Sequence, residues 1–104
     1  MTTEEVYEKS CEIIAHAGDS KSYSMEAIQN AEEGNFSAAE ECFRNADTAL
    51  HTAHNLHTDL LVIEAKDLGC VPVNMMLLHA SNHMTAAELT RDFAEKIVNI
   101  YQSK

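Results

Sequence analysis

Between residues 36 and 60 the apolar residues recur in alternating steps of three and four. This spacing places them on one face of an α-helix and does not fit the two-residue period of a strand. The face comprises Phe36, Ala39, Phe43, Ala46, Leu50, Ala53, His57 and Leu60. The pattern therefore predicts an amphipathic helix over 36–66 that buries one side against other elements.

The few helix-breaking residues divide the chain into two further helices. The sequence contains one proline and three glycines, too few for a turn-rich β fold. Gly34 ends a first helix, which is predicted over 3–33. Gly69 and Pro72 separate the second helix from a third, which is predicted over 73–102.

Capping signals accompany two of the predicted helix starts. Thr2 with Glu5, and Ser37 with Glu40, have the spacing of a capping box. Long helices joined by short connections are typical of bundles. The sequence therefore predicts an all-α fold, an antiparallel up-down-up three-helix bundle, in a single domain spanning 1–104.

The third predicted helix carries two adjacent apolar stripes. The first comprises Met76, His79, His83, Ala86, Thr90, Phe93, Ile97 and Ile100. The second comprises Met75, Leu78, Asn82, Thr85 and Leu89. Two stripes give this helix more than one face to bury. We expect one stripe to face the other two helices and the other to pack against another copy of the chain.

Composition excludes several classes of protein. Seven basic and 17 acidic residues give a net charge of −10, which opposes binding to nucleic acid. No run reaches the roughly 18 apolar residues that a membrane-spanning helix needs. Cys11, Cys42 and Cys70 have neither zinc-site nor redox spacing, so we expect small apolar residues in a reducing, cytoplasmic protein.

Histidines are the most notable polar feature of the sequence. His79 and His83 lie four residues apart and share one helix face, and His57 lies on the apolar face of the preceding helix. Three interpretations of the pair remain open: a hydrogen-bonded polar layer in the core, a zinc site, or an imidazole nucleophile. The other three histidines are expected to be surface or packing residues. They are His16, His51 and His54.

Four segments of the chain resemble one known family. They are EIIAHAGDSKS (12–22), EAIQNAEEGNFSAAE (26–40), the positions AH (53–54), T (58) and LL (60–61) of the second helix, and HASNHMTA (79–86). In this order and at these helix lengths they are similar to the lactose/cellobiose-type enzyme IIA family of the sugar phosphotransferase system. The last segment resembles the region around the family's phosphorylated histidine.

The resemblance implies a phosphocarrier. The histidine that matches His79 accepts a phosphoryl group from HPr and passes it to a cysteine of enzyme IIB, for uptake of a lactose/cellobiose-type β-disaccharide. The family assembles as a homotrimer with its third helices inside. His83 is expected to hydrogen-bond the phosphoryl oxygens. Ser81 would do the same if it faces the site. Independently of the resemblance, we expect His57 to line this site if the register of the second and third helices places it opposite.

Two departures from the family pattern affect these expectations. Asn82 stands where the family has an aspartate that holds a divalent metal ion, Mg²⁺, on the trimer axis. Three amides can hydrogen-bond one another, so we expect little or no metal dependence. The motif after His83 is also one residue shorter, which would rotate the rest of a continuous helix by about 100°.

Two alternative functions follow from these departures and from the histidines. A non-catalytic regulator or assembly protein would keep the same fold after losing transfer. A histidine-based metal-binding bundle would use His57, His79 and His83 together as ligands.

Overall fold

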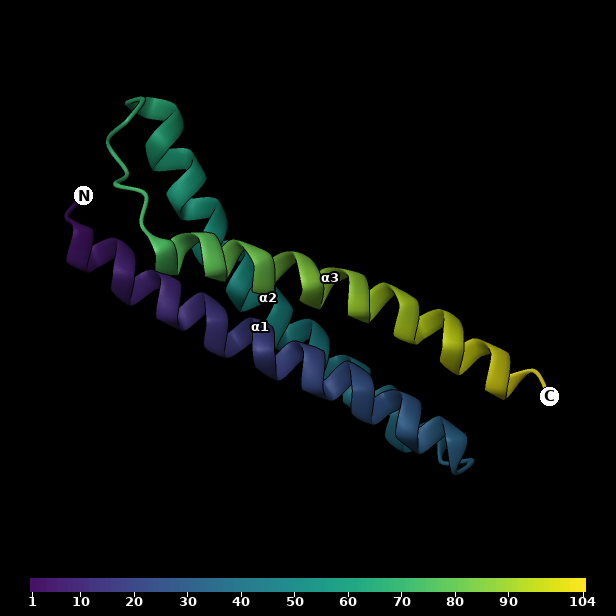
Figure 1. Cartoon of the computed structure of the whole chain (residues 1–104). Coiled ribbons are helices and arrows are strands. Elements are labelled where there is room, and N and C mark those ends of the chain that lie inside the picture. Colours follow the sequence, from purple (N-terminus) through teal and green to yellow (C-terminus); the bar gives the residue numbers. More distant parts are fainter.

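The computed structural model describes residues 1–104 and consists of three helices with no strands (Figure 1). The helices are α1 (Thr3–Glu32), α2 (Phe36–Lys66) and α3 (Met75–Gln102). They form an elongated bundle of 52 × 20 × 18 Å, in which successive helices run in opposite directions. The prediction of an all-α, antiparallel three-helix bundle is confirmed.

The predicted cap of α1 is confirmed and that of α2 is wrong. The Thr2 hydroxyl accepts a hydrogen bond from the Glu5 amide at 3.1 Å, and the Glu5 carboxylate accepts one from the Thr2 amide at 3.0 Å. The bond from the Thr2 amide lowers the pKa of Glu5. At α2 the N-cap is Asn35, whose side chain makes no capping bond. Ser37 already lies inside the first turn of that helix, too late to cap it.

The connection before α3 folds back toward the chain's N-terminus. Asn74 caps α3 by accepting a hydrogen bond from the Leu77 amide at 2.9 Å, so the helix begins at Met75 rather than at residue 73. The N-terminal ammonium group donates to the Cys70 carbonyl at 3.4 Å. The start of α3 is therefore held beside the start of α1 (Figure 1).

α1 is the central helix, because it packs along both α2 and α3, which meet each other over a shorter stretch. Its buried residues follow the same alternation of three and four as those of α2. They are Val6, Ser10, Ile13, Ala17, Ser20, Ser24, Ala27 and Ala31. Most of these side chains are small, so two helices can approach α1 closely.

α3 packs on α1 and α2 through a face that neither predicted stripe contains. Its buried residues are Ala80, Met84, Ala87, Ala94 and Val98. The expectation that one of the two stripes would face the other helices is therefore wrong: apart from Met84, which is in neither stripe, and the half-buried Leu77, most of the larger apolar residues of α3 remain outside. The buried positions keep their register beyond His83, so the shorter motif causes no break in the helix. None of the three helices has a stretch apolar enough to cross a membrane.

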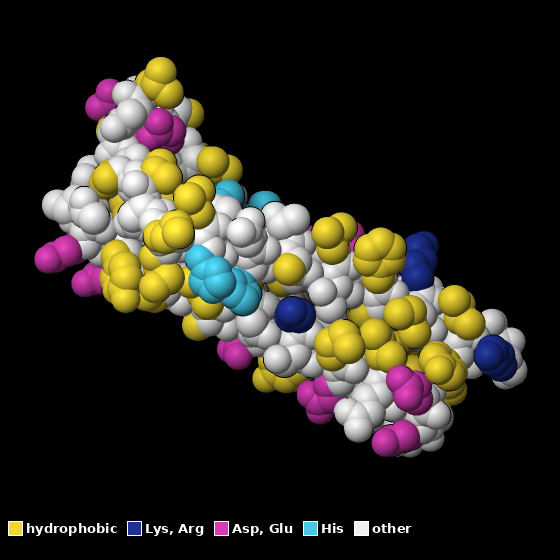
Figure 2. All heavy atoms as spheres, in the orientation of Figure 1, with side chains coloured by type: hydrophobic (Ala, Val, Ile, Leu, Met, Phe, Trp, Pro, Cys, Tyr) yellow, Lys and Arg dark blue, Asp and Glu magenta, His cyan; other side chains and the backbone are white.

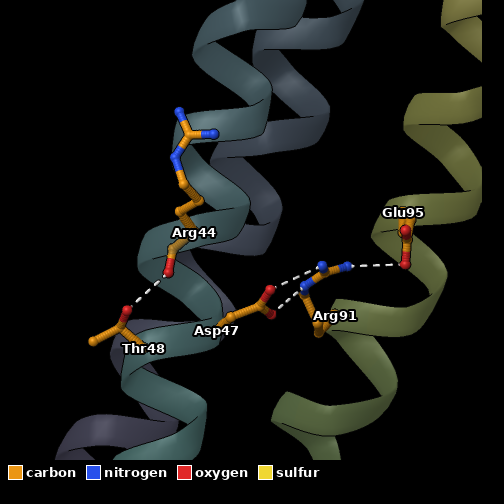
Figure 3. A network of polar contacts seen from close by, with 5 residues as sticks. All are labelled: Arg44, Asp47, Thr48, Arg91 and Glu95. Atoms are coloured by element: carbon orange, nitrogen blue, oxygen red, sulfur yellow. Dashed lines mark hydrogen bonds and ion pairs between the residues drawn. The ribbon is translucent and has the colours of Figure 1, made fainter.

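One ion-pair network ties α2 to α3 (Figure 3). Arg91 donates to both carboxylate oxygens of Asp47, at 2.6 and 3.1 Å, and to Glu95 at 3.2 Å. Its guanidinium also lies 4.3 Å from the centre of the Phe43 ring. The hydrogen bond to Asp47 raises the pKa of Arg91, so this cation is fixed in its charged form.

The three cysteines are free thiols. Cys42 is buried between the helices, and this burial raises the pKa of its thiol. A buried, protonated thiol behaves as a small apolar residue, as predicted for it.

Candidate functional site

His79 and His83 form a hydrogen-bonded pair on the surface of α3. Their Nε2 atoms lie 3.1 Å apart, and the ring planes are nearly perpendicular, at 87°. His79 is exposed and His83 is half-buried. One Nε2 donates its N–H and the other accepts with its lone pair, so the accepting imidazole carries no proton on Nε2. Figure 2 shows histidines exposed near the middle of the bundle.

The pair lies in a shallow hollow between α1 and α3, which we call the histidine hollow. It has a volume of about 260 Å³ and is lined by Lys21, His79, Asn82, His83 and Ala86. Lys21 is exposed on α1 and takes part in no ion pair. The sequence did not single out this lysine as a site residue. Only the register between α1 and α3 brings it to the histidines, although it lies in the family-like segment 12–22.

His57 and Ser81 form a separate pair on another side of α3. The His57 Nε2 lies 3.2 Å from the Ser81 hydroxyl, between α2 and α3. Ser81 follows His79 by two residues in α3. Two residues correspond to a rotation of about 200° around the helix axis, so Ser81 points away from His79. Within the chain the structure does not bring Ser81 or His57 to the histidine hollow.

The remaining histidines lie outside the hollow. His54 is exposed, with its Nδ1 3.5 Å from a Glu88 carboxylate oxygen. His16 and His51 line none of the surface pockets. They fit the expectation of surface or packing residues.

Within one chain, no set of side chains forms a site for a divalent metal ion. No group of three or more histidine, cysteine, aspartate or glutamate side chains is arranged to hold one. The metal-binding bundle is therefore wrong for the chain by itself, because His57 is turned away from His79 and His83. Asn82 offers only a neutral amide, beside the positive charge of Lys21. Mg²⁺ prefers charged oxygen ligands in octahedral geometry, which this hollow lacks.

A helical bundle that displays a neutral imidazole, held by a second imidazole and next to a cation, is suited to carrying an anionic group on histidine. The family model described as "PTS system, Lactose/Cellobiose specific IIA subunit" matches residues 8–102. The chain belongs to this family of phosphotransferase-system components.

Individual members of this family match the chain over nearly their full length. The lactose-specific EIIA component of Streptococcus mutans is 31% identical over 98% of this chain and 97% of its own. The crystal structure of the cellobiose-specific enzyme IIA from Bacillus anthracis has a TM-score of 0.91 at 28% identity, covering 99% of this chain and 92% of its own. The Escherichia coli IIA(chitobiose), solved in complex with HPr, has a TM-score of 0.79 at 25% identity and covers 94% of each chain.

Proposed function

We propose that this chain is a cytoplasmic phosphocarrier that accepts a phosphoryl group from HPr on His79 and passes it to a cysteine of enzyme IIB. The transfer would serve uptake of a lactose/cellobiose-type β-disaccharide. The observation that carries the proposal is the exposed His79 ring with its Nε2 3.1 Å from that of His83. HPr as donor is supported by the IIA(chitobiose) relative that was solved in complex with it.

The histidine pair defines how His79 would act. We assign the proton of the shared contact to His83, whose Nε2–H donates to the lone pair of the His79 Nε2. His79 then keeps its own proton on Nδ1, so its ring is neutral and its Nε2 carries no proton. This arrangement holds the nucleophilic nitrogen at the surface without requiring a base to deprotonate it.

The transfer itself is an in-line displacement at phosphorus. The His79 Nε2 lone pair forms the new N–P bond, while the bond from phosphorus to the donor breaks and its electron pair stays with the donor atom. The hydrogen bond from the His83 Nε2–H to the His79 Nε2 breaks, and the same N–H then donates to a phosphoryl oxygen. In the second transfer a thiolate of enzyme IIB forms the S–P bond, and the N–P electron pair returns to His79, which leaves as a neutral imidazole.

We further propose that the chain acts as a homotrimer assembled along α3, as the family resemblance implies. The outer face of α3 exposes large apolar residues: Leu78 is 54% exposed, Leu89 52%, Phe93 65% and Ile100 57%. Figure 2 shows hydrophobic side chains gathered on both sides of the histidines along the bundle. An apolar face of this extent is typical of a subunit interface.

Intact-mass spectrometry after incubation with phosphoenolpyruvate, enzyme I and HPr tests the carrier function. We expect one acid-labile phosphoryl group on the wild type and none on His79→Gln. His54→Gln is the matched control, because it removes an exposed histidine outside the hollow. No adduct on the wild type with competent donors would reject the carrier and leave a non-catalytic regulator of the same fold.

A further inference from the structure

We propose that Lys21 binds the phosphoryl group on His79 and supplies the positive charge that the histidine hollow needs to hold it. This inference rests on the proposed carrier function and adds a residue of α1 to a site otherwise built on α3. Lys21 would touch the transferred group directly, through its ammonium N–H donors.

The charge balance of the chain calls for such a cation. The chain already carries a net charge of −10, and a phosphoryl group adds up to about two further negative charges. In transfer, negative charge is spread over three phosphoryl oxygens, and catalysis depends mainly on positioned donors and cations. A neutral His83 N–H provides one donor but no charge.

Lys21 is the basic residue that lies beside the two histidines. It lines the histidine hollow with His79 and His83. It also lines the adjoining groove of about 810 Å³ along α1, which again includes His83. No other lysine or arginine lines a pocket that contains either histidine.

Both arginines of the chain already form ion pairs with carboxylates. Arg44 is paired with Glu41 on its own helix, and Arg91 with Asp47 and Glu95. Lys21 has no carboxylate partner, although Glu26 and Glu32 line the groove further along α1. Its charge is therefore available to an incoming anion.

Lys21 takes part in the step without exchanging an atom. The N–P bond to His79 forms and the bond to the donor breaks as described above, and the ammonium group remains protonated throughout. It lowers the free energy of the transition state and of the phosphorylated product by facing the phosphoryl oxygens.

Transfer kinetics provide the first test. The rate of phosphorylation by phospho-HPr is expected to fall about tenfold or more in Lys21→Gln and to be largely restored in Lys21→Arg. Lys66→Gln is the matched control: it makes the same change in net charge on an exposed lysine of α2, away from the apolar face of α3, that lines none of the pockets. Equal rates for the wild type, Lys21→Gln and Lys66→Gln would overturn the proposal.

A chemical test separates this inference from the carrier function. Histidines can be phosphorylated without HPr by phosphoramidate, and the ³¹P resonance missing from His79→Gln identifies the group on His79. A neighbouring cation stabilises the more negative form of that group. We therefore expect its ³¹P titration midpoint to rise in Lys21→Gln and to stay unchanged in Lys66→Gln. An unchanged midpoint in Lys21→Gln would overturn the proposal even if HPr transfers normally. A raised midpoint would uphold it even if HPr does not transfer.

Discussion

Arg91 of α3 holds Asp47 of α2 with two hydrogen bonds, from Nε at 2.6 Å and from Nη2 at 3.1 Å, while its side chain is only 15% exposed. Arg91→Lys loses this two-point geometry and is expected to destabilise the chain by about 1 kcal/mol, lowering the Tm by several degrees. Arg44→Lys is the matched control, because its pair with Glu41 is exposed and lies within one helix.

The Tm of Arg44→Lys is therefore expected to change little. Thermal unfolding followed by circular dichroism compares the two variants. An equal loss of stability in both would show that the link between α2 and α3 contributes nothing of its own.

Ser24 is a buried residue of α1 whose hydroxyl has no hydrogen-bond partner, as is also true of Ser20. Ser24→Ala removes a desolvated polar group and improves helix propensity, so we expect stabilisation of about 1 kcal/mol. Ser10→Ala is the comparison, because that hydroxyl donates to the Val6 carbonyl at 2.7 Å. Denaturant unfolding should show a gain for Ser24→Ala and none for Ser10→Ala; the reverse order would contradict the prediction.

These serines also show why part of the core was not predictable from sequence. The seam of α2 was readable because its members are mostly apolar. On α1 the period is equally regular, but Ser10, Ser20 and Ser24 occupy three of its eight buried positions and look polar. On α3 the large apolar residues outside the bundle masked the small buried ones, such as Ala80 and Ala87. The sequence shows at which spacing apolar residues recur along a helix, but not which of several such faces is buried in the bundle.

The site divides in the same way between local and distant contacts. His79 and His83 were predictable as a pair because four residues make one turn of a single helix. The meeting of His57 with Ser81, and of Lys21 with the histidines, depends on how one helix slides and rotates against another. That register is set by packing along the whole bundle and has no local signal.

His83 is expected to aid transfer without carrying the phosphoryl group. His83→Ala removes the Nε2–H donor, and we expect phosphorylation by phospho-HPr to slow by about ten- to a hundredfold. His83→Gln retains an N–H donor and should lose less. Rates from timed intact-mass spectra distinguish the variants. An adduct that survives in His79→Gln and disappears in His83→Ala would instead place the phosphoryl group on His83.

Phe93 lies in the exposed apolar face of α3 and is expected to be buried between subunits. Phe93→Glu should convert the proposed trimer to a monomer, because three carboxylates would be desolvated at the interface. Leu61→Glu is the control, since Leu61 is similarly exposed, at 57% against 65%, but lies on α2. Native mass spectrometry gives the subunit number directly. A trimer that persists in Phe93→Glu would exclude α3 as the interface.

Asn82 determines the metal dependence that we expect of the proposed trimer. Because the family resemblance puts this position on the trimer axis, the wild type should bring three neutral amides together there, and its Tm should not change with EDTA. Asn82→Asp places three like charges near one another, which costs stability unless a cation neutralises them. We therefore expect this variant to lose stability in EDTA and to regain several degrees with Mg²⁺. Metal analysis by mass spectrometry is the check. One divalent ion per wild-type trimer, together with a Tm that falls in EDTA, would contradict the prediction, because it would show that the Asn82 amide suffices to hold the ion.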